Sequence, residues 1–218
     1  MTTYPNAPKL IKGGIVLLDS DTAQVREVIS LQYNPETMSR SFQIQGVDSG
    51  EGGDRSQALR LKGPPVESYK LDAELDATDL LEVSDAEATS IGLHRELAVI
   101  ESLIYPSSAD ILSNEQLASS GTLEILPMES PLTLFVWSKE RVLPVRITEL
   151  SITEEAYDPA LNPIRAKLSL GLRVLSFDDL GFSHIGSQLF MTYLQNKEQL
   201  KSRYSKFSLQ SLGIEGVL

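Results

Sequence analysis

The fold is decided by one stretch near the C-terminal end, Ile164-Arg165-Ala166-Lys167-Leu168-Ser169-Leu170-Gly171-Leu172-Arg173-Val174. Apolar residues occupy every second position, and a charged residue, a serine or a glycine stands between them. This period of two places successive side chains on opposite faces of a β-strand. We therefore predict a long strand with one buried face, and we expect the core to contain Ile164, Ala166, Leu168, Leu170, Leu172 and Val174.

Two further strands are predicted just before this one. Leu132–Trp137 is almost entirely apolar, which is typical of a strand covered on both faces. In Leu143–Ile152 the apolar positions change phase, so we predict a β-bulge near Thr148–Glu149. Residues 154–163 contain Asp158-Pro159 and Asn162-Pro163, two pairs that favour turns. We interpret this whole segment as a ten-residue loop.

The first half of the chain also has β patterns. Leu10–Leu18 and Val25–Tyr33 are separated by a turn composition, which predicts an N-terminal hairpin. Arg40–Gln45 and Tyr69–Asp76 both alternate between apolar and polar residues, and the second has an acidic polar face. Between them, Gly46–Asp54 contains four glycines and predicts a flexible loop.

Two helices are expected. Ser84 and Glu87 have capping-box spacing, and the stripe Leu93, Leu97, Ile100 and Ile104 follows, so the first helix is predicted from Ser84 to Pro106. Residues 107–121 fit either a short helical turn or irregular structure. The second helix is predicted over Ser183–Ser205. The fold class is therefore α+β, mainly β, with a domain over residues 1–176 and a C-terminal helix and tail over residues 177–218.

Composition excludes several kinds of chemistry. The 218 residues include no cysteine and two histidines, which removes thiol catalysis, disulfides and cysteine-ligated metal sites. Nineteen basic against thirty acidic residues give a net charge of −11, which disfavours nucleic acid. No segment resembles a secretory leader or reaches the ~20 apolar residues of a membrane span. We expect synthesis in the cytoplasm, no membrane insertion and no metal or cofactor.

Three candidate sites lack the residues that their chemistry needs. The Gly46–Asp54 loop has no Lys-Ser or Lys-Thr pair for a phosphate-binding loop, and its acids lack the spacing of a calcium-binding EF-hand loop. An ion site there remains the less favoured alternative. A glycosidase cleft usually has aromatic residues beside its two carboxylates, and the sequence around Asp76 and Asp79 has no such cluster. We predict that the chain is not an enzyme.

Three segments carry a family resemblance. The first combines Pro8-Lys9 and Gly13-Gly14-Ile15 with Leu31-Gln32-Tyr33-Asn34-Pro35-Glu36. The second is the acidic strand Lys70–Asp79. The third comprises Pro131–Trp137, Leu143–Ile147 and Ala156–Ala166, and it is the most specific. Together, over residues 8–176, they are similar to the tube-protein family of contractile injection systems.

This resemblance implies a tail-tube-like β-sandwich or split barrel with one packed helix, forming a homo-oligomeric ring, expected to be a hexamer, in a phage-tail-like particle. Relatives often join the inner tube to the spike hub, and many carry a C-terminal peptidoglycan-binding LysM module, which this chain lacks. The resemblance thus implies an adaptor whose partners are the inner tube protein, the spike or hub protein and other baseplate subunits. The inner tube subunit itself and a standalone β-sandwich binding module remain alternatives.

Inter-subunit contacts are expected at two places. A ten-residue connection exceeds what a hairpin needs, and long loops are often functional, which nominates Tyr157, Asp158, Pro159, Asn162 and Pro163. On the C-terminal helix we nominate Leu189, Tyr193 and Leu194, together with the basic Lys201 and Arg203. The basic end would face an acidic surface of a neighbour, such as residues 67–101 with their ten acids. The alternatives are that the helix packs on its own sheet and that the acids form a solvated face.

Overall fold

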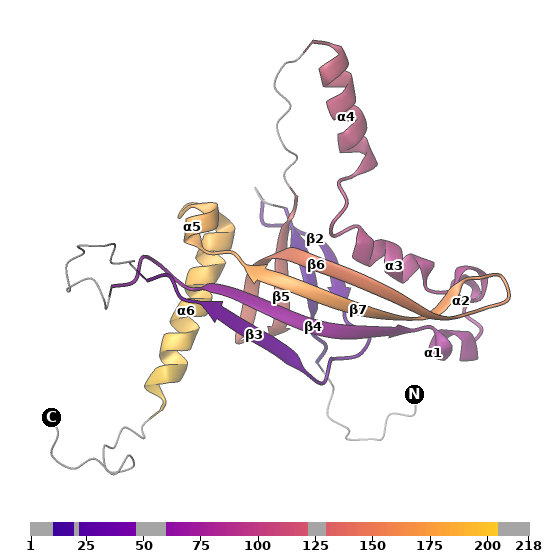
Figure 1. The fold of residues 1–218 in the computed structure, drawn as a ribbon, viewed down its shortest axis with the longest axis horizontal. Coiled ribbons are helices and arrows are strands. Elements are labelled where there is room, and N and C mark those ends of the chain that lie inside the picture. The colour runs from indigo at the N-terminus through magenta and orange to yellow at the C-terminus, as the bar shows by residue number, and fades with distance from the viewer. Residues whose placement is uncertain (1–10, 20–21, 47–59, 122–129, 205–218) are drawn as a thin grey trace, which may run out of the picture.

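The computed structural model describes residues 11–19, 22–46, 60–121 and 130–204. Its strands form one antiparallel sheet of seven, in the order β2-β1-β5-β6-β7-β4-β3 (Figure 1). The α+β class with a large antiparallel sheet is confirmed. The strands are β1 (Gly14–Leu18), β2 (Val25–Ser30), β3 (Met38–Gln43), β4 (Val66–Asp76), β5 (Leu132–Ser138), β6 (Arg141–Tyr157) and β7 (Pro163–Val174).

The sheet is strongly curled. The rings of Tyr69 on β4 and Phe135 on β5 have centroids 5.6 Å apart, although β6 and β7 lie between these two strands in the sheet order. Both side chains are buried in the main core. The core is therefore not enclosed between two separate sheets. One continuous sheet wraps around its own apolar face, as in a split barrel.

The decisive stretch forms the centre of this sheet. β7 pairs with β4 on one side and β6 on the other, so that Leu170 lies opposite both Leu71 and Leu150. The predicted alternation is confirmed, because Ala166, Leu168, Leu170, Leu172 and Val174 are buried and Ile164 is half-buried. The predicted hairpin of β1 and β2 is confirmed as well.

β6 differs in length from the expectation. The predicted bulge is confirmed, since the register with β7 shifts between Ile147 and Glu149. The ten-residue loop, however, is wrong: residues 154–157 continue the strand, and only residues 158–162 form the turn. Charged pairs rather than apolar residues support this extension. Glu155, for example, accepts a hydrogen bond of 2.9 Å from Lys167, so the strand continues beyond its apolar alternation.

The predicted single helix from Ser84 is also wrong. The segment forms α1 (Thr78–Glu82), α2 (Ala86–Ile91) and α3 (His94–Glu101) at one end of the sheet (Figure 1). Asp85, not Ser84, caps α2 by accepting from the amides of Glu87 and Ala88. Gly92 has φ +57° and separates α2 from α3. The stripe survives in part: Leu93, Leu97 and Ile100 are buried, whereas Ile104 lies beyond the end of α3 and is exposed.

Three more helices complete the described chain. α4 (Ser108–Ser119) is helical where the sequence left the choice open, and it projects away from the sheet (Figure 1). α5 (Phe177–Leu180) leads into α6 (Ile185–Ser202), which crosses the other end of the sheet. None of the described helices is long and apolar enough to cross a membrane. The Gly46–Asp54 loop lies outside the described residues except for Gly46, which pairs with Leu61.

Candidate interaction surfaces

The turn between β6 and β7 is built by hydrogen bonds that the Asp158 side chain accepts. Its carboxylate accepts from the amides of Ala160 and Asn162, each at 2.8 Å, and from the Asn162 side chain at 2.8 Å. These bonds, led by that of the Asn162 side chain, lower the pKa of Asp158. Asn162 also donates to the carbonyl of Ser90 on α2 at 3.1 Å. Asp158 and Asn162 thus hold the turn in shape and fasten it to α2.

The predicted contact residues of this turn separate into two groups. Pro163 is buried, and its carbonyl accepts from the amide of Leu93 at 2.9 Å, so it serves the fold rather than the surface. Tyr157 and Pro159 are exposed, and so is Leu161, which the sequence did not nominate. A partner contact through these exposed side chains stays a prediction.

α6 packs on its own sheet, which is the alternative that the sequence left open. Tyr193 and Phe190 are buried in the main core, and Leu194 is half-buried. Leu189 packs against a second apolar cluster, formed by Leu18, Leu132 and Leu134. Of the nominated residues, Lys201 and Arg203 are exposed at the end of the helix.

A buried carboxylate anchors α6, and the sequence analysis missed it. Glu67 on β4 is 3% exposed. It accepts from the hydroxyls of Tyr69 (2.7 Å) and Tyr193 (3.0 Å) and from the ammonium of Lys197 (3.1 Å). The guanidinium of Arg40 on β3 lies 3.8 Å away. Both carboxylate oxygens therefore have at least one donor, and a second cation lies nearby, as a buried charge requires.

The two tyrosines of this cluster stay protonated to unusually high pH. Burial raises the pKa of the Tyr193 hydroxyl most, and its hydrogen bond with Tyr69 and the charge of Glu67 raise it further. Burial likewise raises the pKa of Tyr69. A sequence signal for this cluster existed, because Glu67 lies in phase with the inward-facing Tyr69 and Leu71.

The Leu31–Glu36 motif holds the curled sheet together. The Asn34 amide accepts from the backbone of Gly13 (2.9 Å) and donates to that of Ile11 (2.8 Å). The Gln32 amide accepts from the backbone N–H of Asp76 (2.9 Å) and donates to its carbonyl (2.7 Å). Each side-chain amide thus both accepts from a backbone N–H and donates to a backbone carbonyl, as a residue of a neighbouring strand would. The motif is thus a structural clamp between the β1–β2 hairpin and the end of β4.

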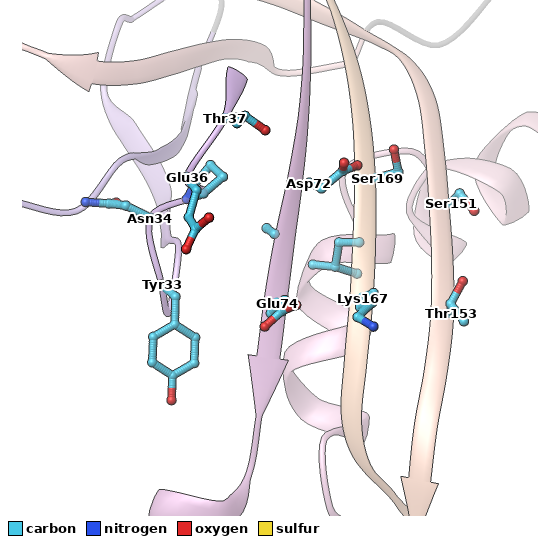
Figure 2. Close-up of a pocket in the computed structure, with 13 residues that line it drawn as sticks. Tyr33, Asn34, Glu36, Thr37, Asp72, Glu74, Ser151, Thr153, Lys167 and Ser169 are labelled. Carbon is cyan, nitrogen blue, oxygen red and sulfur yellow. The ribbon is translucent and has the colours of Figure 1, made fainter. Parts of the chain in front are cut away.

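Beside this clamp lies a groove of about 570 Å³. Its floor consists of two cross-strand rows on β4, β7 and β6, Asp72-Ser169-Ser151 and Glu74-Lys167-Thr153 (Figure 2). Residues 33–37 form its wall. Lys167 is already paired with Glu155, and across the described ranges no three acids or histidines come together as a metal site. Among the described residues, no hydrogen bond joins a serine or threonine of these two rows to a carboxylate, so the groove shows no hydroxyl activated by a base.

The comparison with known families is decisive. The family model of contractile injection system tube proteins matches residues 9–179. The chain belongs to this family. A tube-family protein is a structural component of a contractile, phage-tail-like particle, and its role is non-enzymatic.

Solved structures resemble the tube-family chain more distantly. One is titled as the virion of a native gene transfer agent particle, with 13% identity, 74% of this chain and 90% of that chain covered, and a TM-score of 0.28. Another is the tail of an empty gene transfer agent particle with C6 symmetry, with 14% identity, coverages of 75% and 90%, and a TM-score of 0.28. No curated protein matches this tube-family chain.

Proposed function

We propose that this tube-family protein is a ring-forming adaptor, expected to be hexameric, between the inner tube and the spike hub of a contractile injection system. It would be made in the cytoplasm and assembled there with the tube protein, the spike or hub protein and other baseplate subunits. The observation that supports an adaptor is α6. This helix lies beyond the family-matched residues 9–179, yet it is fixed to the sheet through Glu67, Tyr193 and Phe190.

A fixed additional helix suits an adaptor for a physical reason. A subunit that stacks without limit needs two ring faces that complement each other, because every layer repeats the same contact. An adaptor instead meets a different protein on each face. α6 covers one end of the sheet, while α1–α3 cover the other (Figure 1). At one end of the sheet, the anchored helix thus adds a surface that does not belong to the matched residues 9–179.

The inner tube subunit is the second candidate. It is favoured by the length of the family match, which runs from residue 9 to residue 179 and includes all seven strands of the sheet. The two candidates differ in what the purified protein does alone. An adaptor forms rings that do not grow, whereas a tube subunit forms fibres that lengthen with concentration and time.

Electron microscopy of the full-length protein tests this difference. We expect closed rings alone, and rings bound at the end of tubes when the tube protein is added. Long fibres of the protein alone would overturn the adaptor. A variant pair then tests the exposed turn: Tyr157→Asp should prevent attachment to tube or hub, while Lys139→Asp, at the exposed β5–β6 turn, should not. Equal attachment of both variants would show that the turn at residues 157–161 is not part of the interface.

A further inference from the structure

α4 packs none of its side chains into a core formed by the described residues. It contains no buried residue, and it projects into solvent (Figure 1). Ile111, Leu112 and Leu117 are 50%, 63% and 50% exposed. An isolated helix of about twelve residues is marginal in water, and most helical stability in proteins comes from tertiary packing. These features indicate a surface that another molecule covers.

The charge of α4 restricts that molecule to a basic one. From Glu96 to Ser138 the chain has six acids and no lysine or arginine. α4 contributes Asp110 and Glu115, and neither makes an ion pair with a residue in the described ranges. A partner for α4 therefore needs cations beside an apolar side chain.

The end of α6 has this combination. Lys201 and Arg203 are exposed, and among the described residues neither forms an ion pair. Leu200, beside them, is 46% exposed. The α6 tip, Leu200–Arg203, thus complements α4 in charge and in apolar content.

Four of the ten acids of residues 67–101 already pair with a cation. Glu67 pairs with Lys197, Asp76 with Arg165, and both Glu87 and Glu96 with Arg95. Pairing a second cation with these carboxylates would gain little. In the described part of the chain neither acid of α4 has such a competitor, so both remain available to a cation of another molecule.

We propose that α4 of one copy of this chain docks on the α6 tip of the next copy. The two surfaces lie on opposite sides of the sheet (Figure 1), so α4 cannot reach the α6 tip of its own chain. Two different patches that complement each other make a heterologous contact, and such contacts close into a ring when the rotation allows. The proposal rests on the ring assembly of the proposed function and names the contact that forms the ring.

Cysteine cross-linking tests this contact directly, since the chain has no cysteine of its own. Full-length Ser113→Cys protein is mixed with full-length Ser202→Cys protein and treated with a short bis-maleimide. Both positions are exposed, one on α4 and one at the α6 tip. We expect a dimer of the two variants. Ser90→Cys, exposed on α2, mixed with Ser202→Cys is the control and should give at least tenfold less dimer.

Charge reversal then tests the chemistry. Asp110→Lys with Glu115→Lys in the Ser113→Cys protein should reduce the cross-link at least tenfold. Adding Lys201→Glu with Arg203→Glu to the Ser202→Cys partner should restore it. Raising the salt concentration should weaken the native contact, because exposed ion pairs are screened. Glu82→Lys with Glu140→Lys is the matched control, since it makes the same charge change at exposed acids elsewhere and should leave the cross-link unchanged.

The outcomes separate this proposal from the adaptor. Fibres by microscopy with a selective α4–α6 cross-link overturn the adaptor and support the contact. Rings without the cross-link, or with a cross-link that ignores charge reversal, overturn the contact and leave the adaptor. The contact is also overturned if the protein stays monomeric and Ser113→Cys with Ser202→Cys gives no more dimer than the Ser90→Cys control. It is overturned as well if Ser113→Cys cross-links to added tube or hub protein and not to a second copy of this chain.

Discussion

The ammonium of Lys197 on α6 lies 3.1 Å from a carboxylate oxygen of Glu67 on β4, across 130 positions of the chain. The carboxylate is buried, while the lysine is partly open to solvent. Both tyrosine hydroxyls of the cluster donate to the same carboxylate. Glu67 is thus the shared acceptor that joins α6 to the sheet, and Lys197 is one of several donors to it.

This asymmetry predicts unequal costs of mutation. Glu67→Ala leaves the buried hydroxyls of Tyr69 and Tyr193 without their acceptor, and we expect it to lower the free energy of unfolding by about 2–4 kcal/mol. Lys197→Met keeps the packing of the stem and leaves the other donors in place, so its cost should be about 1–2 kcal/mol. Urea denaturation measures both. A larger cost for Lys197→Met would show that the ion pair, not the hydroxyls, anchors α6.

The raised pKa of Tyr193 predicts a loss of stability in alkali. In the unfolded chain a tyrosine ionises near pH 10, whereas the pKa in the folded protein is higher. Above pH 10 the unfolded state therefore loses protons that the folded state keeps, and the free energy of unfolding falls as pH rises. Well below pH 10 the tyrosine is protonated in both states, and the contribution is complete. We expect urea denaturation to show this fall between pH 9 and 11 and Tyr193→Phe to reduce it; an equal slope in the variant would contradict the assignment.

Gly92 is predicted to be intolerant of a side chain for two separate reasons. Its φ is +57°, and an added Cβ would lie 2.4 Å from the carbonyl oxygen of Pro163. Gly121 has φ +89°, but no described residue would lie within 4 Å of its added Cβ. Gly121→Ala should therefore cost about 1 kcal/mol from backbone strain alone, and Gly92→Ala about 3 kcal/mol or more. Thermal unfolding compares them, and equal shifts in Tm would exclude the contact with Pro163.

Removal of the chain after Ser176 is predicted to prevent stable folding. The truncation deletes Phe190 and Tyr193 from the main core and leaves Glu67 buried without Tyr193 or Lys197. Lost apolar packing of this size costs several kcal/mol, against a total stability of about 5–15 kcal/mol. We expect aggregated protein on size-exclusion chromatography. A monomeric, folded fragment would instead support the division into residues 1–176 and 177–218.

The sequence predicted the sheet well because burial of one strand face imposes a period of two. β7 and β4 follow this rule along most of their length, and the phase change at Thr148 located the bulge. The rule stops where charged pairs replace apolar ones. Glu155 and Lys167 extend the β6–β7 ladder without an apolar signal, so the alternation of apolar residues does not predict this extension.

The helical segment and the interaction surface were harder to predict because they depend on contacts distant in sequence. Gly92 breaks the helix where the backbone approaches Pro163, which is 71 positions away. Glu67 is recognisable as inward-facing from its phase, but its donors come from β3 and α6. The family motif at Gln32 and Asn34 was found in the sequence, whereas its function as a clamp required the three-dimensional arrangement.

The two asparagines that fasten turns in this protein also resist chemical ageing. Asn34 and Asn162 are each followed by proline. Deamidation of asparagine begins when the backbone nitrogen of the next residue attacks the side-chain amide, and proline has no N–H to lose in that step. Subunits that are not exchanged after a particle has assembled accumulate any such chemical damage. We expect mass spectrometry of aged protein to find deamidation at Asn114 or Asn196, which precede other residues, before it appears at either fastening position.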